Sequence, residues 1–169
     1  MTRPLALHPD RLLPADPATR AIARALYHSV AALPIISPHG HTDPAWWADD
    51  APFGNAAQLL LHPDHYVLRM LYSQGIAMEA LGIGNPAADP RESWRLLAAN
   101  YLLFRGTPSR MWLDWVFAEC FGLKVQLSAE TSDHYFDSIT AALATPAFRP
   151  RALFERYNIE LIATTESPL

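Results

Sequence analysis

Residues 34–44 read PIISPHGHTDP, and this stretch decides how the whole chain is interpreted. Ile35 and Ile36 form a short apolar run between prolines, which is typical of a buried strand. His39, Gly40 and His41 follow shortly after this run. Side chains two residues apart in an extended chain point the same way, so both imidazoles face one side. The stretch therefore predicts a strand that delivers a pair of histidines at its end.

The composition is that of a folded protein. Half of the 169 residues are hydrophobic, which is enough to bury one core, and a single domain is expected. The net charge of -4 is scattered without runs, so we expect neither a nucleic-acid nor a membrane partner. Residues 1–10 lack a signal-peptide pattern, and no apolar stretch is long enough to span a bilayer. We therefore expect a soluble, cytoplasmic protein, with the lone Cys120 in its core.

Most of the remaining chain has helical periodicity, interrupted by glycine and proline. A loop containing Pro52 and Gly54 is expected in the first half. The predicted helical segments are 17–33 after an Asp16 cap, 64–72, a turn at 78–81, 90–105, a mostly buried 111–121, an amphipathic 128–144 and a short helix from Pro150.

A second strand is predicted at about 159–165, whereas the first occupies about 34–37. A helical insertion of about 43–145 separates them. Strands so far apart in sequence need a crossover connection, which makes them parallel, and the helix before Ile159 can cover the pair. The expected fold class is therefore α/β.

The histidine pair suits one divalent metal. A neutral imidazole binds zinc at about 2.0–2.1 Å, but a catalytic site usually has a third protein ligand and an open position. His39 and His41 are thus half a site, and their position after a strand favours metal binding over a chance pattern. Asp43 is either a third ligand or the N-cap of a helix that begins at Pro44, and the cap is favoured.

A second group of polar residues follows Asp64. His65 and Arg69 are four residues apart, so both can share one helix face beside Tyr66. Arginine can hold a carboxylate bidentately, while a phenol or imidazole can move a proton near a carbonyl. The spacing alone favours an ordinary amphipathic helix with a solvated Arg69 and a capping Asp64.

Residues 164–168, TTESP, follow the second strand and should lie on the same rim as the histidines. Their hydroxyls could bind sugar oxygens, although such a turn is common in any strand-to-helix connection. Trp46 and Trp47 are expected to pack between helices, with sugar stacking as the alternative.

Taken in order, four motifs resemble the uronate isomerase family of the amidohydrolase superfamily: HGH at 39–41, DHY at 64–66 with Arg69, LATPAF at 143–148 and TTESP at 164–168. The match runs from Leu12 to the last residue. The resemblance implies the N-terminal part of a distorted metal-dependent (β/α)8 barrel. The helical insertion would lie between its first two strands, and the rest of the barrel would lie outside these 169 residues.

The resemblance also implies residue roles. His39 and His41 are the metal ligands of the first strand, and the expected cofactor is one divalent metal, zinc. His65 and Tyr66 face the substrate as catalytic and binding residues, and Arg69 belongs to the same substrate-binding motif. The family's remaining ligand, an aspartate late in the barrel, falls beyond Leu169.

The function implied is the interconversion of D-glucuronate with D-fructuronate and of D-galacturonate with D-tagaturonate. The reaction is an aldose–ketose isomerisation through an enediol, and a homo-oligomer is a possible assembly. Two other hypotheses remain: a metal-dependent hydrolase of the same superfamily, or an inactive helical module that binds a partner or packs. Residues 1–169 alone are expected to be inactive.

Overall fold

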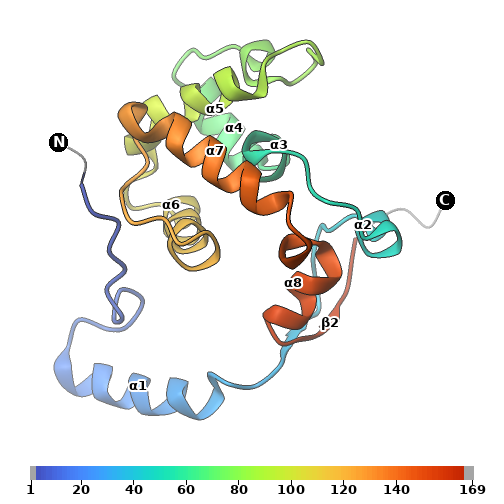
Figure 1. Cartoon of the computed structure of the whole chain (residues 1–169). Coiled ribbons are helices and arrows are strands. Elements are labelled where there is room, and N and C mark those ends of the chain that lie inside the picture. Colours follow the sequence, from blue (N-terminus) through green and yellow to red (C-terminus); the bar gives the residue numbers. More distant parts are fainter. Residues whose placement is uncertain (1–2, 166–169) are drawn as a thin grey trace. The chain divides into compact units, whose positions relative to one another are not determined.

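The computed structural model describes residues 3–165, so Glu166, Ser167 and Pro168 of the TTESP motif lie outside the described residues. The chain forms two compact units, whose elements are labelled in Figure 1. The strand unit comprises residues 8–52 and 146–165, and the helical unit comprises residues 3–7 and 53–145. The helical insertion is thus large enough to build its own core.

The strand unit is built on a parallel pair, as the sequence predicts. β1 (Ile35–Ser37) pairs with β2 (Ile159–Ile162), with a register shift between Ile35 and Ile36. The backbone ladder continues beyond the regular strands, because the Ala163 amide donates to the Ser37 carbonyl at 2.8 Å. The helices of this unit are α1 (Pro17–Val30), α2 (Pro44–Asp49) and α8 (Pro150–Arg156), with a 3-10 turn at Pro146–Phe148.

The expectation that the first strand is buried is wrong. Ile36 is 61% exposed in β1, and Leu161 is 49% exposed in β2. Parallel strands are buried only where layers cover both faces of the sheet, and the described residues supply two strands with little cover. No residue of α1 is buried either, although its Asp16 cap forms as predicted.

Helices α2 and α8 are fastened together by Arg151. Its guanidinium donates to the carbonyls of Trp47 and Ala48 at the end of α2, at 2.8 and 2.9 Å. The backbone amide of Arg151 donates to the Asp50 carboxylate at 3.0 Å. The Trp47 and Phe154 rings meet edge to face at 5.7 Å, so Trp47 packs between helices as expected.

The helical unit contains helices of the predicted insertion around an aromatic core. Trp94, Tyr101, Phe117 and Tyr135 are almost fully buried, and the Trp94 indole donates to the Ser132 carbonyl. The elements are α3 (Ala56–Leu60), α4 (His65–Tyr72), η1 (Met78–Leu81), α5 (Pro90–Ala99), η2 (Tyr101–Phe104), α6 (Pro108–Trp115), η3 (Val116–Cys120), η4 (Ala129–Thr131) and α7 (Ser132–Leu143).

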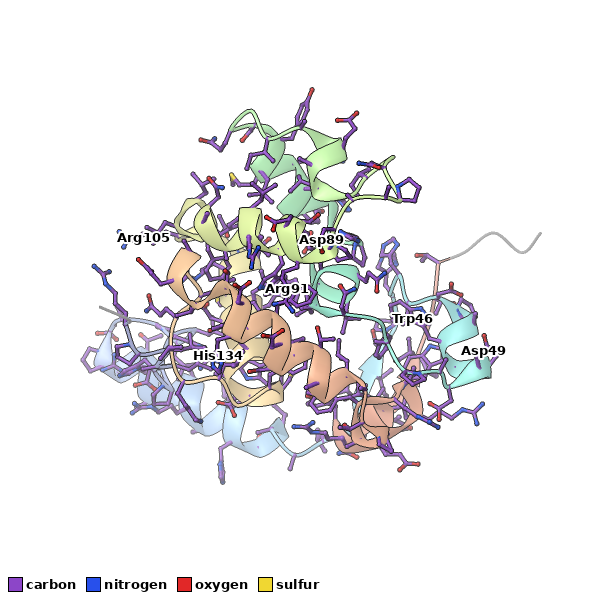
Figure 2. All side chains as sticks on the ribbon, turned by 45° about the horizontal axis from the view of Figure 1, so that its top comes forward. Trp46, Asp49, Asp89, Arg91, Arg105 and His134 are labelled. Atoms are coloured by element: carbon purple, nitrogen blue, oxygen red, sulfur yellow. The ribbon has the colours of Figure 1, made fainter. Side chains whose placement is uncertain are left out.

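Helices α5 and α7 lie side by side in this unit (Figure 1). Arg91 of α5 forms an ion pair with Asp137 of α7 and places its guanidinium over the Phe136 ring, 4.4 Å from the centroid. Figure 2 labels Arg91 on α5 and His134 on the neighbouring helix. Charged and aromatic contacts therefore supplement the buried apolar face that the sequence predicts for residues 128–144.

Four details of the insertion differ from the predictions. The helix expected at 90–105 is divided at Asn100, whose side chain donates to the Leu96 carbonyl. The segment expected to be mostly buried exposes Trp112 by 39%, and Cys120 is half-buried rather than in the core. The predicted loop after Gly54 contains α3, because Asn55 and Gln58 form a capping box.

His62 gives the helical unit a pH-dependent element. Its Nε2 atom is buried without a hydrogen-bond partner among the described residues, and burial lowers the pKa of the imidazole. As the pH falls below about 6.5, the unfolded chain takes up a proton at this histidine before the folded chain does. The folded state is therefore expected to lose stability in acid through His62.

We predict that His62→Leu flattens this pH dependence. The free energy of unfolding in urea, measured between pH 8 and pH 5, should fall less for the variant than for the unchanged chain. The exposed His134, replaced by Gln, is the control and should retain the original slope. Parallel curves for His62→Leu and the unchanged chain would contradict the prediction.

Candidate metal centre and substrate-facing helix

The carboxyl end of β1 places the two histidines next to each other. The Ser37 hydroxyl donates to the His39 carbonyl at 3.2 Å, and the chain then passes through Gly40 to His41. The two Nε2 atoms lie 3.2 Å apart, and the rings are nearly perpendicular, at 82°. Both side chains are exposed.

This geometry fits two ligands of one metal ion. Two nitrogens that each lie about 2.0–2.1 Å from a tetrahedral ion are about 3.3 Å apart. The observed Nε2–Nε2 distance of 3.2 Å matches that spacing. Within residues 3–165 no group of three His, Cys, Asp or Glu side chains is arranged to hold a metal. Among the described residues, the histidine pair is therefore a candidate for two ligand positions, and metal binding by it stays a prediction.

Asp43 acts as a helix cap. Its Oδ1 atom accepts the Ala45 amide at 2.9 Å, and α2 begins at Pro44, as favoured from the sequence. The Thr42 hydroxyl is buried and has no hydrogen-bond partner among residues 3–165, which leaves one polar group beside the histidines unsatisfied.

The end of β2 reaches the histidine pair through Thr165. Its amide and its hydroxyl both donate to the Gly40 carbonyl, at 3.0 and 2.8 Å. The same hydroxyl lies 3.2 Å from Nδ1 of His41. Within the described part of the TTESP motif, Thr165 therefore lies beside the histidines, and its hydroxyl is already bonded there. From the sequence, the motif predicted hydroxyl groups on the same rim as the histidines, but it did not predict the contact between Thr165 and His41.

Gly40 is required by close packing against β2. A Cβ atom there would lie 3.2 Å from the Ala163 carbonyl oxygen, tighter than most such contacts. Gly40 is not among the residues with positive φ, so the constraint is steric rather than conformational. A glycine between the two histidines allows the two strand ends to approach.

We predict that Gly40→Ala loosens the end of the strand pair. Overpacking of this size costs about 1–3 kcal/mol. Hydrogen exchange of the Ala163 and Thr165 amides should accelerate, while the exposed Pro38, replaced by Ala, serves as the control and should leave both rates unchanged. Unaltered exchange in Gly40→Ala would show that the strands tolerate a methyl group at this position.

The second group of predicted residues lies on α4 in the helical unit. Asp64 caps this helix by accepting the Tyr66 and Val67 amides, at 2.9 and 3.1 Å. Val67, Leu68 and Leu71 bury one face, whereas His65, Tyr66 and Arg69 are exposed. The His65 and Tyr66 rings are 4.2 Å apart. The helix thus has the predicted cap and also presents an imidazole, a phenol and a guanidinium to its outside.

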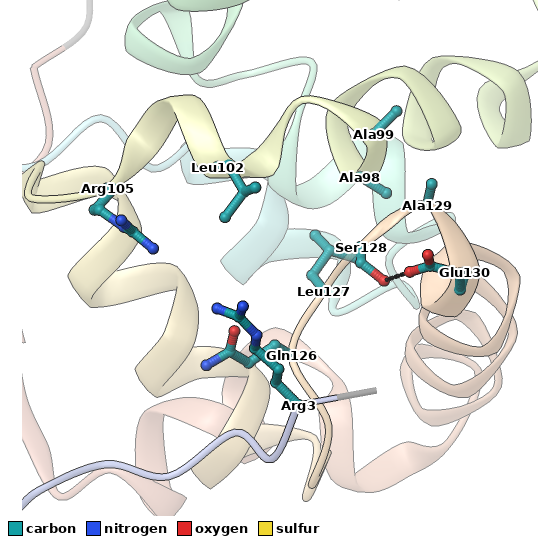
Figure 3. Close-up of a pocket in the computed structure, with 10 residues that line it drawn as sticks. All are labelled: Arg3, Ala98, Ala99, Leu102, Arg105, Gln126, Leu127, Ser128, Ala129 and Glu130. Atoms are coloured by element: carbon teal, nitrogen blue, oxygen red, sulfur yellow. Dashed lines mark hydrogen bonds between the residues drawn. The ribbon is translucent and has the colours of Figure 1, made fainter. Parts of the chain in front are cut away.

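Two hollows among the described residues are lined by none of His39, His41, His65, Tyr66 and Arg69. In the strand unit, α2, α8 and β2 enclose about 470 Å³, lined by Trp47, Phe154 and Thr164 among others. In the helical unit, Arg3, Arg105 and Gln126 surround about 430 Å³, where the Ser128 hydroxyl donates to Glu130 (Figure 3). The candidate residues therefore form two separate groups, the histidine pair in the strand unit and His65, Tyr66 and Arg69 in the helical unit.

The fold and the histidine pair define a class: α/β proteins that carry paired imidazoles at the carboxyl end of a parallel strand. Residues 17–169 match the model of the glucuronate isomerase family. The chain belongs to the glucuronate isomerase family, which confirms the resemblance found from the motifs.

The relatives agree with this assignment. The chain is 76% identical to the uronate isomerase of Sphingopyxis alaskensis over 169 residues, covering 100% of this chain and 36% of that protein. It is 70% identical to the uronate isomerase of Rhizorhabdus wittichii over 166 residues, covering 98% of this chain and 35% of that protein. The chain therefore spans little more than a third of the length of these curated relatives.

Solved structures show the same α/β arrangement. The glucuronate isomerase of Caulobacter crescentus superposes with a TM-score of 0.93 at 61% identity, covering 97% of this chain and 35% of that one. The uronate isomerase of Thermotoga maritima superposes with a TM-score of 0.83 at 26% identity, covering 95% of this chain and 34% of that one.

No helix formed by residues 3–165 is long and apolar enough to cross a membrane.

Proposed function

We propose that the protein containing this chain is a hexuronate isomerase. It interconverts D-glucuronate with D-fructuronate and D-galacturonate with D-tagaturonate. The observation that carries the proposal is the family match over residues 17–169, together with relatives that bear the name uronate isomerase. No feature of the chain favours the hydrolase or the inactive helical module.

The reaction moves a proton between adjacent carbons. Carbon 2 of the open-chain aldose loses a proton, an enediol forms, carbon 1 gains a proton, and the hydroxyl proton on oxygen 2 passes to oxygen 1. Tyr66 and His65, exposed on α4, are the proposed proton-handling groups. Arg69, one helical turn on, is the proposed partner of the substrate carboxylate, which a guanidinium holds bidentately.

His39 and His41 are proposed to hold one divalent metal, zinc. The 3.2 Å separation of their Nε2 atoms supports this role. When bound, such an ion polarises substrate oxygens. The complete centre needs a further protein ligand, so we expect residues 1–169 alone to be inactive.

The full protein is proposed to be a (β/α)8 barrel in which β1 and β2 are the first two strands. Such a barrel takes roughly 250 residues, and the parallel pair with α8 before its second strand supports this architecture. A cytoplasmic location is proposed because a single cysteine among 169 residues suits a reducing compartment. Assembly into a homo-oligomer is also proposed.

We predict that His39→Ala and His41→Ala, made in the full-length protein, lose bound zinc. Loss of supporting residues alone lowers metal affinity by about 10–100-fold, so loss of a ligand should lower isomerase turnover by more than about 100-fold. Metal content and ketose formation from D-glucuronate are the measurements. His28→Ala, an exposed histidine of α1, is the control. Undiminished zinc and turnover would refute the metal assignment, and a product formed by the net addition of water, rather than an isomer of the substrate, would favour a hydrolase.

We predict that Tyr66→Phe, in the same protein, lowers turnover while zinc remains bound. Acid–base groups contribute about 10²–10⁴-fold to catalysis, and this substitution removes only the phenolic hydroxyl. Tyr72 offers a matched control because it lies on the same helix and is 59% exposed, against 66% for Tyr66. Steady-state kinetics of both variants are the measurement. Equal losses of turnover in Tyr66→Phe and Tyr72→Phe would contradict the proton-handling role of Tyr66.

A further inference from the structure

We propose that Thr165 is a positioning residue for His41. Its hydroxyl holds the imidazole as the tautomer that carries its proton on Nδ1 and leaves Nε2 free to bind a metal. The inference rests on the proposed metal role of the histidine pair. It stands on the 3.2 Å contact between the Thr165 hydroxyl and His41 Nδ1, across 124 positions of sequence.

The backbone brings Thr165 to this position. Beyond the regular strands, Ala163 bonds to Ser37 at 2.8 Å and Thr165 bonds to Gly40 at 3.0 Å. These two hydrogen bonds fix residue 165 beside the glycine that separates the histidines. The absence of a side chain at Gly40 allows the approach, since a Cβ atom there would be 3.2 Å from the Ala163 carbonyl. The pairing of the two strands therefore places the Thr165 hydroxyl next to the His41 ring.

The hydrogen-bond pattern determines the direction of the contact. The Thr165 hydroxyl has one proton, and its 2.8 Å bond to the Gly40 carbonyl uses that proton, because a carbonyl can only accept. Toward His41 the hydroxyl oxygen is therefore an acceptor, and Nδ1 of His41 carries the proton. A neutral imidazole has one N–H, so the Nε2 atom of His41 keeps its lone pair.

The nitrogen that keeps its lone pair is the one that lies close to the other histidine. Nε2 of His41 is the atom that lies 3.2 Å from Nε2 of His39, the spacing expected for two ligands of one ion. A ring that is locked in tautomer and orientation loses less freedom when it binds a metal. Groups that support a metal-binding histidine in this way typically change metal affinity by about 10–100-fold.

Two other roles for the Thr165 hydroxyl make different predictions. A hydroxyl that binds a sugar oxygen would affect the KM for the hexuronate and leave zinc affinity unchanged. A hydroxyl that serves only to bind the Gly40 carbonyl would affect the strand end, and a backbone donor is already present there in the Thr165 amide. Zinc affinity therefore separates the positioning role from sugar binding, and thermal melting measured alongside it reports any loosening of the strand end.

The experiment compares Thr165→Val, Thr165→Ala and Thr165→Ser in the full-length protein. Zinc affinity is measured by competition with a chelator, and folding is checked by thermal melting. Thr165→Val and Thr165→Ala both remove the hydroxyl but leave side chains of different size. If one variant misfolds, the other still tests the proposal. Thr164→Val is the matched control, because it removes the neighbouring hydroxyl of the same motif.

We expect Thr165→Val and Thr165→Ala to weaken zinc binding by about 10–100-fold, and Thr165→Ser and Thr164→Val to bind as tightly as the unchanged protein. Unchanged zinc affinity in Thr165→Val and Thr165→Ala would overturn the proposal, as would a loss in Thr165→Ser as large as in Thr165→Val. His41→Ala is measured alongside: if it keeps zinc undiminished, the proposed metal site itself fails, and the inference fails with it.

Discussion

The parallel pairing of β1 with β2 is the constraint on which the candidate metal centre depends. Its hydrogen bonds continue past the regular strands and join Thr165 to Gly40, between the two histidines. A pair of histidines in an unsupported loop could turn their rings independently. Here the second strand contacts the backbone between them and the ring of His41. The strand pair therefore fixes the contact between Thr165 and His41, which the HGH motif alone does not predict.

The other side of the histidine loop is held by a different interaction. Asp43 caps α2, and Arg151 of α8 donates to carbonyls at the end of the same helix. Residues 38–43 therefore lie between a strand ladder and an anchored helix. Side chains that extend from such rigid supports keep their geometry better than side chains on free loops. The arrangement explains how two exposed imidazoles can maintain a spacing suited to one ion.

Local signals made much of the fold predictable. Asp16–Pro17, Asp43–Pro44 and Asp89–Pro90 each mark a helix start, because an aspartate cap and a first-turn proline act within a few residues. The parallel pairing followed from the length of the connection. The exposure of Ile36 and the bond from Thr165 to His41 were not predictable, because both depend on which distant segments lie beside a residue.

The two groups of candidate residues, one in each unit, differ in how well the chain supports them. Tyr66 and its neighbours are placed by a capped helix with a buried apolar face, so their exposure follows from the helix itself. The histidine pair is placed by strands whose apolar side chains are half exposed, as with Leu161 at 49%. In the proposed barrel, further strands and helices cover those side chains. Completing the sheet would thus stabilise the strand pair that orients His41, which links folding of the barrel to assembly of the metal centre.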